Sequence, residues 1–473
     1  MVDGREIAAQ FEDAADFETR KVLCGGQLLT VLFLDGLTSG RDIAEQVLRP
    51  LAQMTDEARE EVLYTRALQG GVWCASVKEP ESTQHAAELL VNGFCVILFP
   101  KSGKALGCEV KTGEKRSPSP PETENTVKGA KDAFTETLRT NTSLVRRHLR
   151  TPGLRLTETV VGKRTLTKVT VCWIDRLTDP ELPRRMQERL SSIDIDGALS
   201  PAAIEEYVTG SRRTAFPLLE YTERTDHFCQ GLLDGQVGLL ADGLPLGYLA
   251  PVGLGRLMRS PEDRATDFLS ASMLRLLRYA ALGVSLLLPA LYAAMAMFHQ
   301  QMLPTKLLLS IIESKQNVPF STLLEVLGLL CAFELLQQAG LHLPQAVGTA
   351  VSIIGGLVVG TAAVDAKLVS PAALIVTASS GICGFTLPNR ELSDAVRLWR
   401  FVLTVLAGLW GLFGVTVGLL LLLTELAGLE SLGRSYLSPF GRAEVKGALV
   451  RPRLVRQKWR DGALKPMDDQ NQR

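Results

Sequence analysis

Two carboxylates in an otherwise apolar stretch are the residues whose type and spacing most directly suggest chemistry. Glu325 and Glu334 lie nine positions apart within residues 318–340. An ionisable group in hydrocarbon costs at least a few kcal/mol, so it normally faces protein or water. We expect these two glutamates, with Asp365 beside the next apolar run, to line a polar path through a membrane. A re-entrant or interfacial helix is the alternative for residues 318–340.

The other reactive residue types form no site pattern. The eight cysteines are scattered, with no CxxC pair and no histidine at metal-ligand spacing, so we expect buried reduced thiols and no zinc site. The motifs HExxH, Walker A and GxSxG are absent. The glycines of GGQLLTVLFLDG (25–36) lack the strand-then-GxGxxG order that cradles a pyrophosphate. The sequence therefore predicts no enzyme, no cofactor and no metal site.

Uncharged runs indicate where the chain enters a membrane. The 51 basic and 51 acidic residues balance over the chain, but residues 279–424 are poor in charge. A run of about 20 apolar residues crosses a hydrocarbon core of about 30 Å. We expect four spans, at residues 279–298, 346–364, 368–388 and 401–424. Residues 302–340 are expected to be partly re-entrant, because a fifth span would move the tail to the other side.

Basic residues indicate which side the chain ends occupy. Arg275 and Arg278 precede the first span, and basic residues outnumber acidic ones after Ser431. The positive-inside rule therefore places both termini in the cytoplasm. One feature opposes four spans, because NRELSDAVRLWR (389–400), with three arginines, then falls outside. The first 20 residues carry acids and lack the apolar core of a secretory signal peptide, so we expect the N-terminal half to stay in the cytoplasm.

A strip of small residues marks the second of these runs. Gly348, Ser352, Gly356 and Gly360 recur every fourth position, which places them on one face of a helix. Such residues let a neighbouring helix backbone approach closely, and a bare strip can also line a narrow pore. From the spacing alone we expect packing within the chain, while a contact between subunits or a pore stays open.

The soluble half resembles a tandem repeat. LFLDGLTSGRDI (32–43) resembles CWIDRLTDPELP (172–183), and LLVNGFCVILF (89–99) resembles GLLDGQVGLLAD (231–242), both about 140 residues apart. Each copy predicts a buried strand, an amphipathic helix and a second strand after Asn-Gly or Asp-Gly. Asp35 and Asp175, which end the first strands, are expected to cap the following turns. The predicted fold is α/β, in two tandem subdomains.

These observations predict four regions. The first α/β subdomain with a Pro-rich loop covers residues 1–127, and a helical connection with the second subdomain covers 128–275. An all-α polytopic membrane domain covers 276–430, and a basic cytoplasmic tail covers 431–473. A helix expected near 134–149 carries several basic residues, for which we favour a solvated face over a patch for nucleic acid or lipid headgroups. These residues are Arg139, Arg146, Arg147, His148 and Arg150.

Nearly the whole chain also resembles the A-subunit family of GerA-type spore germination receptors. The stretches that carry this resemblance are FTETLRTNTSLVRRHLR (134–150), SIDIDGAL (192–199), residues 260–299 from SPEDRATDF onward, residues 344–376 around the small-residue strip, and LPN (387–389). The chain departs from the family pattern at KGAKDAF (128–134), FHQQ (298–301) and QQAG (337–340), where residues usual in the family, several of them charged, are replaced.

The resemblance implies a subunit of a nutrient-sensing complex in the inner membrane of a dormant spore. It implies partners, namely a transporter-like B subunit, a lipoprotein C subunit and further copies of this chain, and no nucleic acid. It also implies a ligand-gated ion channel, in which the strip from Gly348 to Gly360 becomes a candidate for the pore or the subunit contact. The alternatives are the stage V sporulation AF branch of the same family, a secondary transporter and a non-conducting membrane scaffold.

Overall fold

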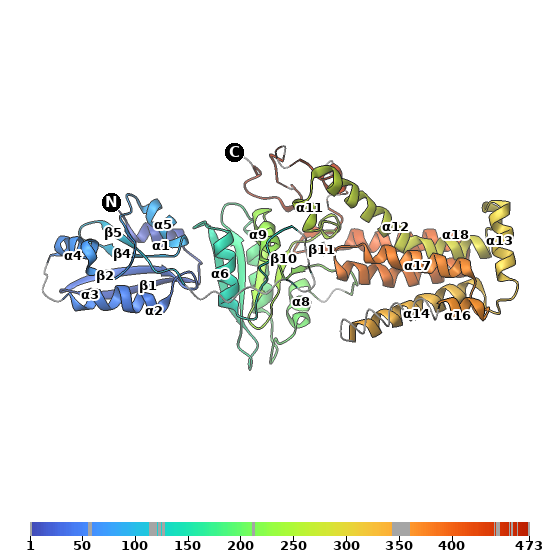
Figure 1. Cartoon of the computed structure of the whole chain (residues 1–473), viewed down its shortest axis with the longest axis horizontal. Coiled ribbons are helices and arrows are strands. Elements are labelled where there is room, and N and C mark those ends of the chain that lie inside the picture. The colour runs from blue at the N-terminus through green and yellow to red at the C-terminus, as the bar shows by residue number, and fades with distance from the viewer. Residues whose placement is uncertain are drawn as a thin grey trace.

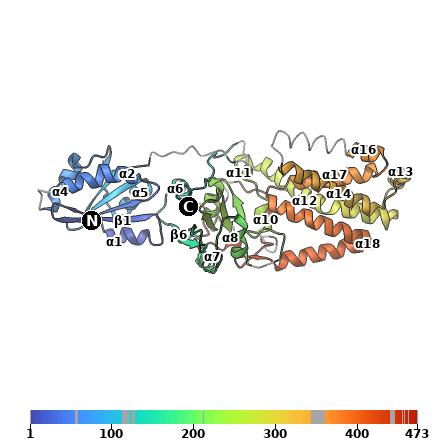
Figure 2. The same ribbon diagram turned by 90° about the horizontal axis from the view of Figure 1, so that it is seen from below.

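The chain forms two α/β units followed by a bundle of long helices (Figure 1, Figure 2). The computed structural model describes residues 2–54, 59–112, 121, 124, 128–210, 213–342, 360–438, 440, 445–453, 455, 457–460 and 462–471. The three parts follow one another along the long axis, with the helical bundle at the end away from the N-terminus. We call the end of the bundle beside the soluble half its near end, and the opposite end, where α13 lies, its far end.

The first unit is an antiparallel sheet covered by helices on both faces. Its strands are β1 (Phe17–Cys24), β2 (Gln27–Leu34), β3 (Val77–Lys78), β4 (Phe94–Phe99) and β5 (Lys104–Glu109), in the order β1-β2-β4-β5-β3. One face packs on η1 (Ile43–Leu48), α3 (Arg49–Gln53) and α4 (Glu60–Arg66), and the other on α1 (Gly4–Gln10) and α5 (Thr83–Val91). Alternation along β2 produces this division, because Leu29 and Val31 join the first core whereas Leu32 and Leu34 join the second.

The second unit repeats this topology, as the sequence repeat predicts. Its strands are β6 (Leu154–Val161), β7 (Thr167–Ile174), β8 (Glu220–Thr222), β9 (Val237–Ala241) and β10 (Gly247–Ala250), in the order β6-β7-β9-β10-β8. Helices α7 (Glu181–Ser191) and α8 (Pro201–Thr209) cover one face, and α6 (Leu138–His148) and α9 (Thr225–Leu233) cover the other. The matched strands β2 and β7 pair antiparallel with β4 and β9, respectively.

The turn residues singled out in the repeat act at helix ends and strand ends. Gly93 and Gly235 follow α5 and α9 with φ angles of 81° and 98°, a left-handed conformation that glycine adopts without steric cost. The Asn-Gly and Asp-Gly pairs therefore end helices instead of closing hairpins. Asp175 accepts a hydrogen bond from the backbone N–H of the next residue, Arg176, at 3.0 Å.

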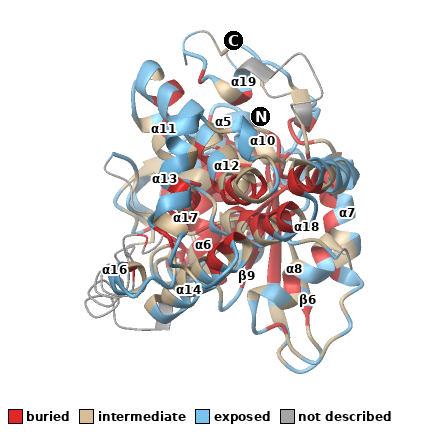
Figure 3. Cartoon of the chain, turned by 90° about the vertical axis from the view of Figure 1, so that its right-hand side faces the viewer, coloured by how far each residue is buried: buried red, intermediate tan, exposed pale blue. Residues whose placement is uncertain are grey.

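The bundle consists of α12 (Phe268–Met297), α13 (Thr305–Lys315), α14 (Thr322–His342), α16 (Gly360–Asp365), α17 (Pro371–Phe385) and α18 (Arg390–Gly428), with a short η3 (Gln300–Met302) after α12. Among the described residues, α12, residues 322–340 of α14, and α18 are long and apolar enough to cross a membrane. Viewed end-on, the buried residues gather where α12, α17 and α18 face one another (Figure 3). The expected re-entrant stretch 302–340 thus divides into α13 and a long apolar helix.

The long helix α18 turns back on itself at Gly411. This residue has φ 62° and ψ −140°, which is not helical. A Cβ added to Gly418 would lie 2.4 Å from Leu403 Cδ2, although 15 residues of straight helix span about 22 Å. The range 390–428 is therefore a hairpin of two antiparallel arms, 390–410 and 412–428. The prediction of one span at 401–424 is wrong in this respect, because that range includes the turn and parts of both arms.

The hairpin also changes where the arginine-rich segment 389–400 lies. Leu392 and Val396 share a core with Val252 and Leu257 of the soluble half, and the turn at Gly411 packs on Phe298 and His299 at the far end. The segment therefore begins beside the soluble half and not on the opposite side, as four spans would require. Hydropathy missed the turn because glycines and leucines continue through it without a polar residue.

Candidate functional site at the junction of the soluble and membrane halves

A short polar connection joins the second sheet to the first long membrane helix. It contains α10 (Leu254–Leu257) and α11 (Glu262–Ala265), and it ends at Asp267, whose carboxylate caps α12. That carboxylate accepts hydrogen bonds from the backbone N–H groups of Leu269 and Ser270 at 3.2 and 3.0 Å. An acidic N-cap fixes where the helix starts and favours its dipole.

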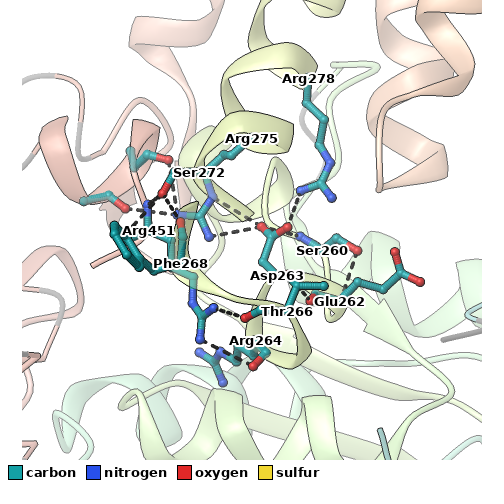
Figure 4. Close-up of polar contacts among 12 residues, drawn as sticks. Ser260, Glu262, Asp263, Arg264, Thr266, Phe268, Ser272, Arg275, Arg278 and Arg451 are labelled. Atoms are coloured by element: carbon teal, nitrogen blue, oxygen red, sulfur yellow. Dashed lines mark hydrogen bonds and ion pairs between the residues drawn. The ribbon is translucent and has the colours of Figure 1, made fainter. Parts of the chain in front are cut away.

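A buried carboxylate in α11 holds the first turns of α12 (Figure 4). Asp263 Oδ2 accepts from Nε and Nη2 of Arg275 at 3.2 and 3.0 Å, and its Oδ1 accepts from Nη1 of Arg278 at 2.8 Å. The Asp263 side chain is only 2% exposed. The two arginines lie three positions apart and so share one helix face. We call Asp263, Arg275 and Arg278 the junction clamp.

The C-terminal segment joins the same point. Arg275 Nη1 also donates to the backbone carbonyls of Gly447 and Ala448. Both residues lie in the short helix α19 (Val445–Leu449). Arg451 donates its backbone N–H to Ser272 Oγ at 3.1 Å, and its guanidinium reaches the carbonyl of Thr266. Residues about 180 positions apart thus converge on the start of α12 (Figure 4). Part of the basic tail is therefore packed against the protein.

A second ion-pair network connects the sheet to this junction. Arg256 of α10 contacts Glu220 of β8 at 2.7 Å and Asp234 at 3.0 Å, and Asp234 also contacts Arg264 of α11 at 3.1 Å. Burial opposes ionisation of Glu220, but attraction to Arg256 and His227 brings its pKa below the ordinary value. Burial likewise opposes ionisation of Asp234, and attraction to Arg264 and Arg256 outweighs it, so its pKa is lowered too. Both carboxylates therefore stay ionised at neutral pH.

An apolar core extends across the same junction. Phe216, Val252 and Met258 of the soluble half pack in one cluster with Leu426 and Tyr436, which lie at the end of α18 and just beyond it. Such packing is stiff, because cores are as dense as organic crystals. The soluble half and the near end of the bundle are therefore joined through ion pairs and a shared core.

The predicted basic helix face instead joins the two soluble units. In α6, Arg146 is fully buried and donates through Nε and Nη2 to Asp16 of the first unit, both at 2.7 Å. Arg139 contacts Asp35 at 3.0 Å. The expectation of a solvated face is therefore wrong for Arg146, because tertiary contacts bury it. A cleft of about 670 Å³ lies beside this contact, with Arg41 and Arg147 among its lining residues.

A histidine ion pair lies at the end of the same helix. His148 Nε2 is 2.7 Å from Asp132 Oδ2. The hydrogen bond to His148 holds the pKa of Asp132 down at about 2. The same bond raises the pKa of His148 above its ordinary value, against the opposing effect of burial.

The three carboxylates predicted to line a membrane path lie in three different environments. Glu325 is buried at the far end, where its Oε2 accepts from the backbone N–H and the hydroxyl of Ser370, the N-cap of α17, at 3.0 and 2.8 Å. Lys315 Nζ lies 3.2 Å from its other oxygen, as an ion pair without hydrogen-bond geometry. Glu334 contacts Arg397 at 2.6 Å. Asp365 is exposed at the end of α16, and no contact among the described residues joins it to the two glutamates.

Most of the small-residue strip lies outside the described residues. This applies to Gly348, Ser352 and Gly356. Gly360 is buried at the start of α16, where an added Cβ would lie 3.6 Å from Leu374 of α17. That position faces a neighbouring helix of the same chain. None of the eight cysteines, all of which lie in the described part of the chain, forms a disulfide, and five of them are buried.

Comparison with known proteins places this architecture in a family. Residues 5–466 match the family described as Bacillus/Clostridium GerA spore germination protein. The chain belongs to the GerA family. It is 36% identical to the uncharacterized membrane protein YfkQ of Bacillus subtilis (strain 168), over 92% of this chain and 84% of that protein.

Two further relatives of this GerA-family chain are named as germination proteins. Spore germination protein KA of Bacillus subtilis (strain 168) is 34% identical, over 94% of this chain and 83% of that protein. Spore germination protein GerLA of Bacillus cereus is 31% identical, over 93% and 90%. The crystal structure of the N-terminal domain of the A subunit of the Bacillus megaterium spore germinant receptor GerK3 is 22% identical, with a TM-score of 0.40, and the match covers 52% of this chain and 92% of that one.

Sequence reasoning did not assign a role to the junction clamp. Arg275 and Arg278 indicated only the orientation of the first span. No role was predicted for Asp263, which lies in the stretch SPEDRATDF. The acid and the two arginines just before an uncharged run are visible in the sequence, but separations of 12 and 15 residues match no helical or strand period, so the sequence does not pair them.

Proposed function

We propose that this chain is a membrane subunit of a spore germination receptor. The observation that carries the proposal is the junction clamp, in which buried ion pairs join a two-sheet soluble half to the first membrane helix of a GerA-family chain. A displacement of β8 or α9 would move Arg256 and Arg264. Because Arg264 and Asp263 both lie in α11, the displacement would reach α12 through the ion pairs of Asp263. The names of the relatives, which are spore germination proteins, support the biological role.

The chain further acts as part of a complex in the spore inner membrane. Its partners are a transporter-like B subunit, a lipoprotein C subunit and further copies of itself, and the oligomer forms a nutrient-gated ion channel. Both termini lie in the cytoplasm, with the domains divided near residues 127, 275 and 430. The shared location of the soluble half, the start of α12 and the end of α18 at the near end of the bundle supports this orientation.

The strip from Gly348 to Gly360 serves in this proposal as the subunit contact or the pore wall. Small residues permit close helix approach, and helices in lipid associate through such packing. A polar path including Glu325, Glu334 and Asp365 belongs to the same proposal. For the two glutamates, the basic partners Lys315 and Arg397 favour a fixed ion-pair role over the coupling-ion site of a secondary transporter.

The proposal is tested with the purified full chain. Ion flux is measured in liposomes, and oligomer size is measured in detergent. We expect a defined oligomer that conducts ions, alone or with its partner subunits, and Gly356→Leu should abolish assembly or flux. The matched control is Gly283→Leu in α12, where an added Cβ meets nothing within 4 Å. An oligomer that never conducts supports a scaffold, and unchanged assembly and flux in Gly356→Leu refute the role of the strip.

A further inference from the structure

A buried arginine in the middle of the bundle makes no direct ion pair with the described part of the chain. Arg400 lies in the first arm of α18 and is 1% exposed. Its Nη1 donates to Ser380 Oγ of α17 at 3.2 Å. Among the described residues, its Nε and Nη2 have no hydrogen-bond partner.

These two nitrogens form the edge of the guanidinium group that donates two hydrogen bonds to one carboxylate. The other buried arginines of this chain show the geometry. Arg146 uses Nε and Nη2 to bind both oxygens of Asp16, and Arg275 uses the same two atoms on Asp263. The empty edge of Arg400 is therefore the edge that binds anions elsewhere in the molecule.

The groups in direct hydrogen-bonding contact at this point are a hydroxyl and a backbone carbonyl, with no carboxylate among them. Ser380 Oγ donates to the backbone carbonyl of Ser285 in α12 at 2.7 Å, so the three helices meet here. Ser285 Oγ is also buried without a partner among the described residues. Glu334, on the adjacent helix α14, is the acid whose charge acts on Arg400, but its ion pair is with Arg397, which also contacts Asp394. The sequence of residues 343–359 contains no Asp or Glu.

We propose that Arg400 holds a small monovalent anion of the size of chloride inside the bundle, between α12, α17 and the first arm of α18. A buried guanidinium edge without a hydrogen-bonding partner is costly, and an anion bound there removes that cost. Arg400 is only 1% exposed, so a lipid phosphate or a partner's side chain does not contact it at the surface. The anion binds at Nε and Nη2, with Ser285 as a neighbouring hydroxyl donor.

The test compares unfolding midpoints of the full chain in detergent at constant ionic strength, with gluconate replaced stepwise by chloride. Chloride bound to the folded state should raise the wild-type midpoint by ~2 °C for each tenfold increase above its dissociation constant. Arg400→Lys keeps a positive charge but loses the two-nitrogen edge, so its midpoint should change little with chloride. Arg400→Gln should behave in the same way. Arg41→Gln, which removes an arginine paired with Glu45 on the exposed surface of the first unit, should keep the wild-type dependence.

A wild-type midpoint that is independent of chloride would overturn the proposal and indicate that water alone occupies the site. An unchanged chloride dependence in Arg400→Lys would place the anion elsewhere and overturn it as well. Bromide anomalous scattering from crystals of the wild-type protein makes the test independent of whether the variants fold. A bromide peak in hydrogen-bonding contact with Arg400 is expected, and bromide peaks only at other positions would refute the assignment.

Discussion

Replacing Asp263 by Asn tests whether the junction clamp holds the membrane helix to the soluble half. The substitution keeps the shape of the side chain but removes the charge that faces Arg275 and Arg278. The Asn amide also presents N–H groups where one arginine now donates. Two guanidinium groups, with side chains 6% and 12% exposed, then lose their counter-ion.

The expected cost follows from burial. Removing one partner of a buried ion pair costs about 3–5 kcal/mol, because the remaining charge stays uncompensated. For a chain of 473 residues, such a loss lowers the unfolding midpoint by roughly 3–5 °C. The carbonyls of Gly447 and Ala448 still accept hydrogen bonds from Arg275 in the variant. We therefore expect a decrease of the unfolding midpoint towards the lower end of this range.

The assay is thermal unfolding of the full chain in detergent, followed by circular dichroism, together with ion flux in liposomes. Glu262→Gln, next in sequence and without an ion pair to either arginine, is the control and should shift the midpoint by less than ~1 °C. A double-mutant cycle with Arg275→Gln should show that the two losses are not additive. Additive losses, or a midpoint for Asp263→Asn equal to that of the control, would refute the clamp.

Three further changes follow from the same structure. Gly414→Ala should prevent the α18 hairpin from closing, because the new Cβ would lie 1.9 Å from Leu406 O. Gly283→Ala, where the new Cβ meets nothing within 4 Å, should be neutral or slightly stabilising. Thermal unfolding compares the two variants, and equal stability would contradict the hairpin. Asp16→Asn should cost about 3–5 kcal/mol and speed hydrogen exchange at the contact between the two soluble units, because Arg146 stays buried without its partner; unchanged exchange there would disprove the contact. His148→Gln should remove a pH-dependent part of the stability. The pKa of His148 is raised, so its pair with Asp132 stabilises the fold fully below the ordinary pKa of about 6.5, and this stabilisation is lost as pH rises through the raised value. The difference in unfolding midpoint between wild type and variant should therefore shrink with rising pH. A difference that stays constant with pH would refute the role of this ion pair.

Local patterns were sufficient for the elements of the soluble half. The apolar runs LLTVLFLD and KVTVCWID predict buried strands, and the repeat at about 140 residues predicts two similar units, which the shared strand order bears out. These features depend on neighbours in sequence, and one chain contains enough of them. The apolar character of α12 and α18 is a property of composition in the same way.

The partners of the charged residues depended on the tertiary structure. The sequence shows Arg146, Arg275 and Arg400 as three similar cations. In the structure, Arg146 joins the two soluble units, Arg275 pairs with Asp263 at the start of α12, and two nitrogens of Arg400 have no hydrogen-bond partner among the described residues. Their acids lie 130 and 12 residues away for the first two, at distances that no helical or strand period relates.

The hairpin at Gly411 shows the same limit in the backbone. Hydropathy averages over a window of about 19 residues, so an apolar run of two antiparallel arms looks like one long span. The turn depends on a positive φ at one glycine and on close contact between Gly418 and Leu403, which only the folded chain brings together. Composition and periodicity therefore determined which segments are helices, strands and membrane-like. The tertiary structure decided which charges are paired and where the chain reverses, because burial and long-range contacts are properties of the whole fold.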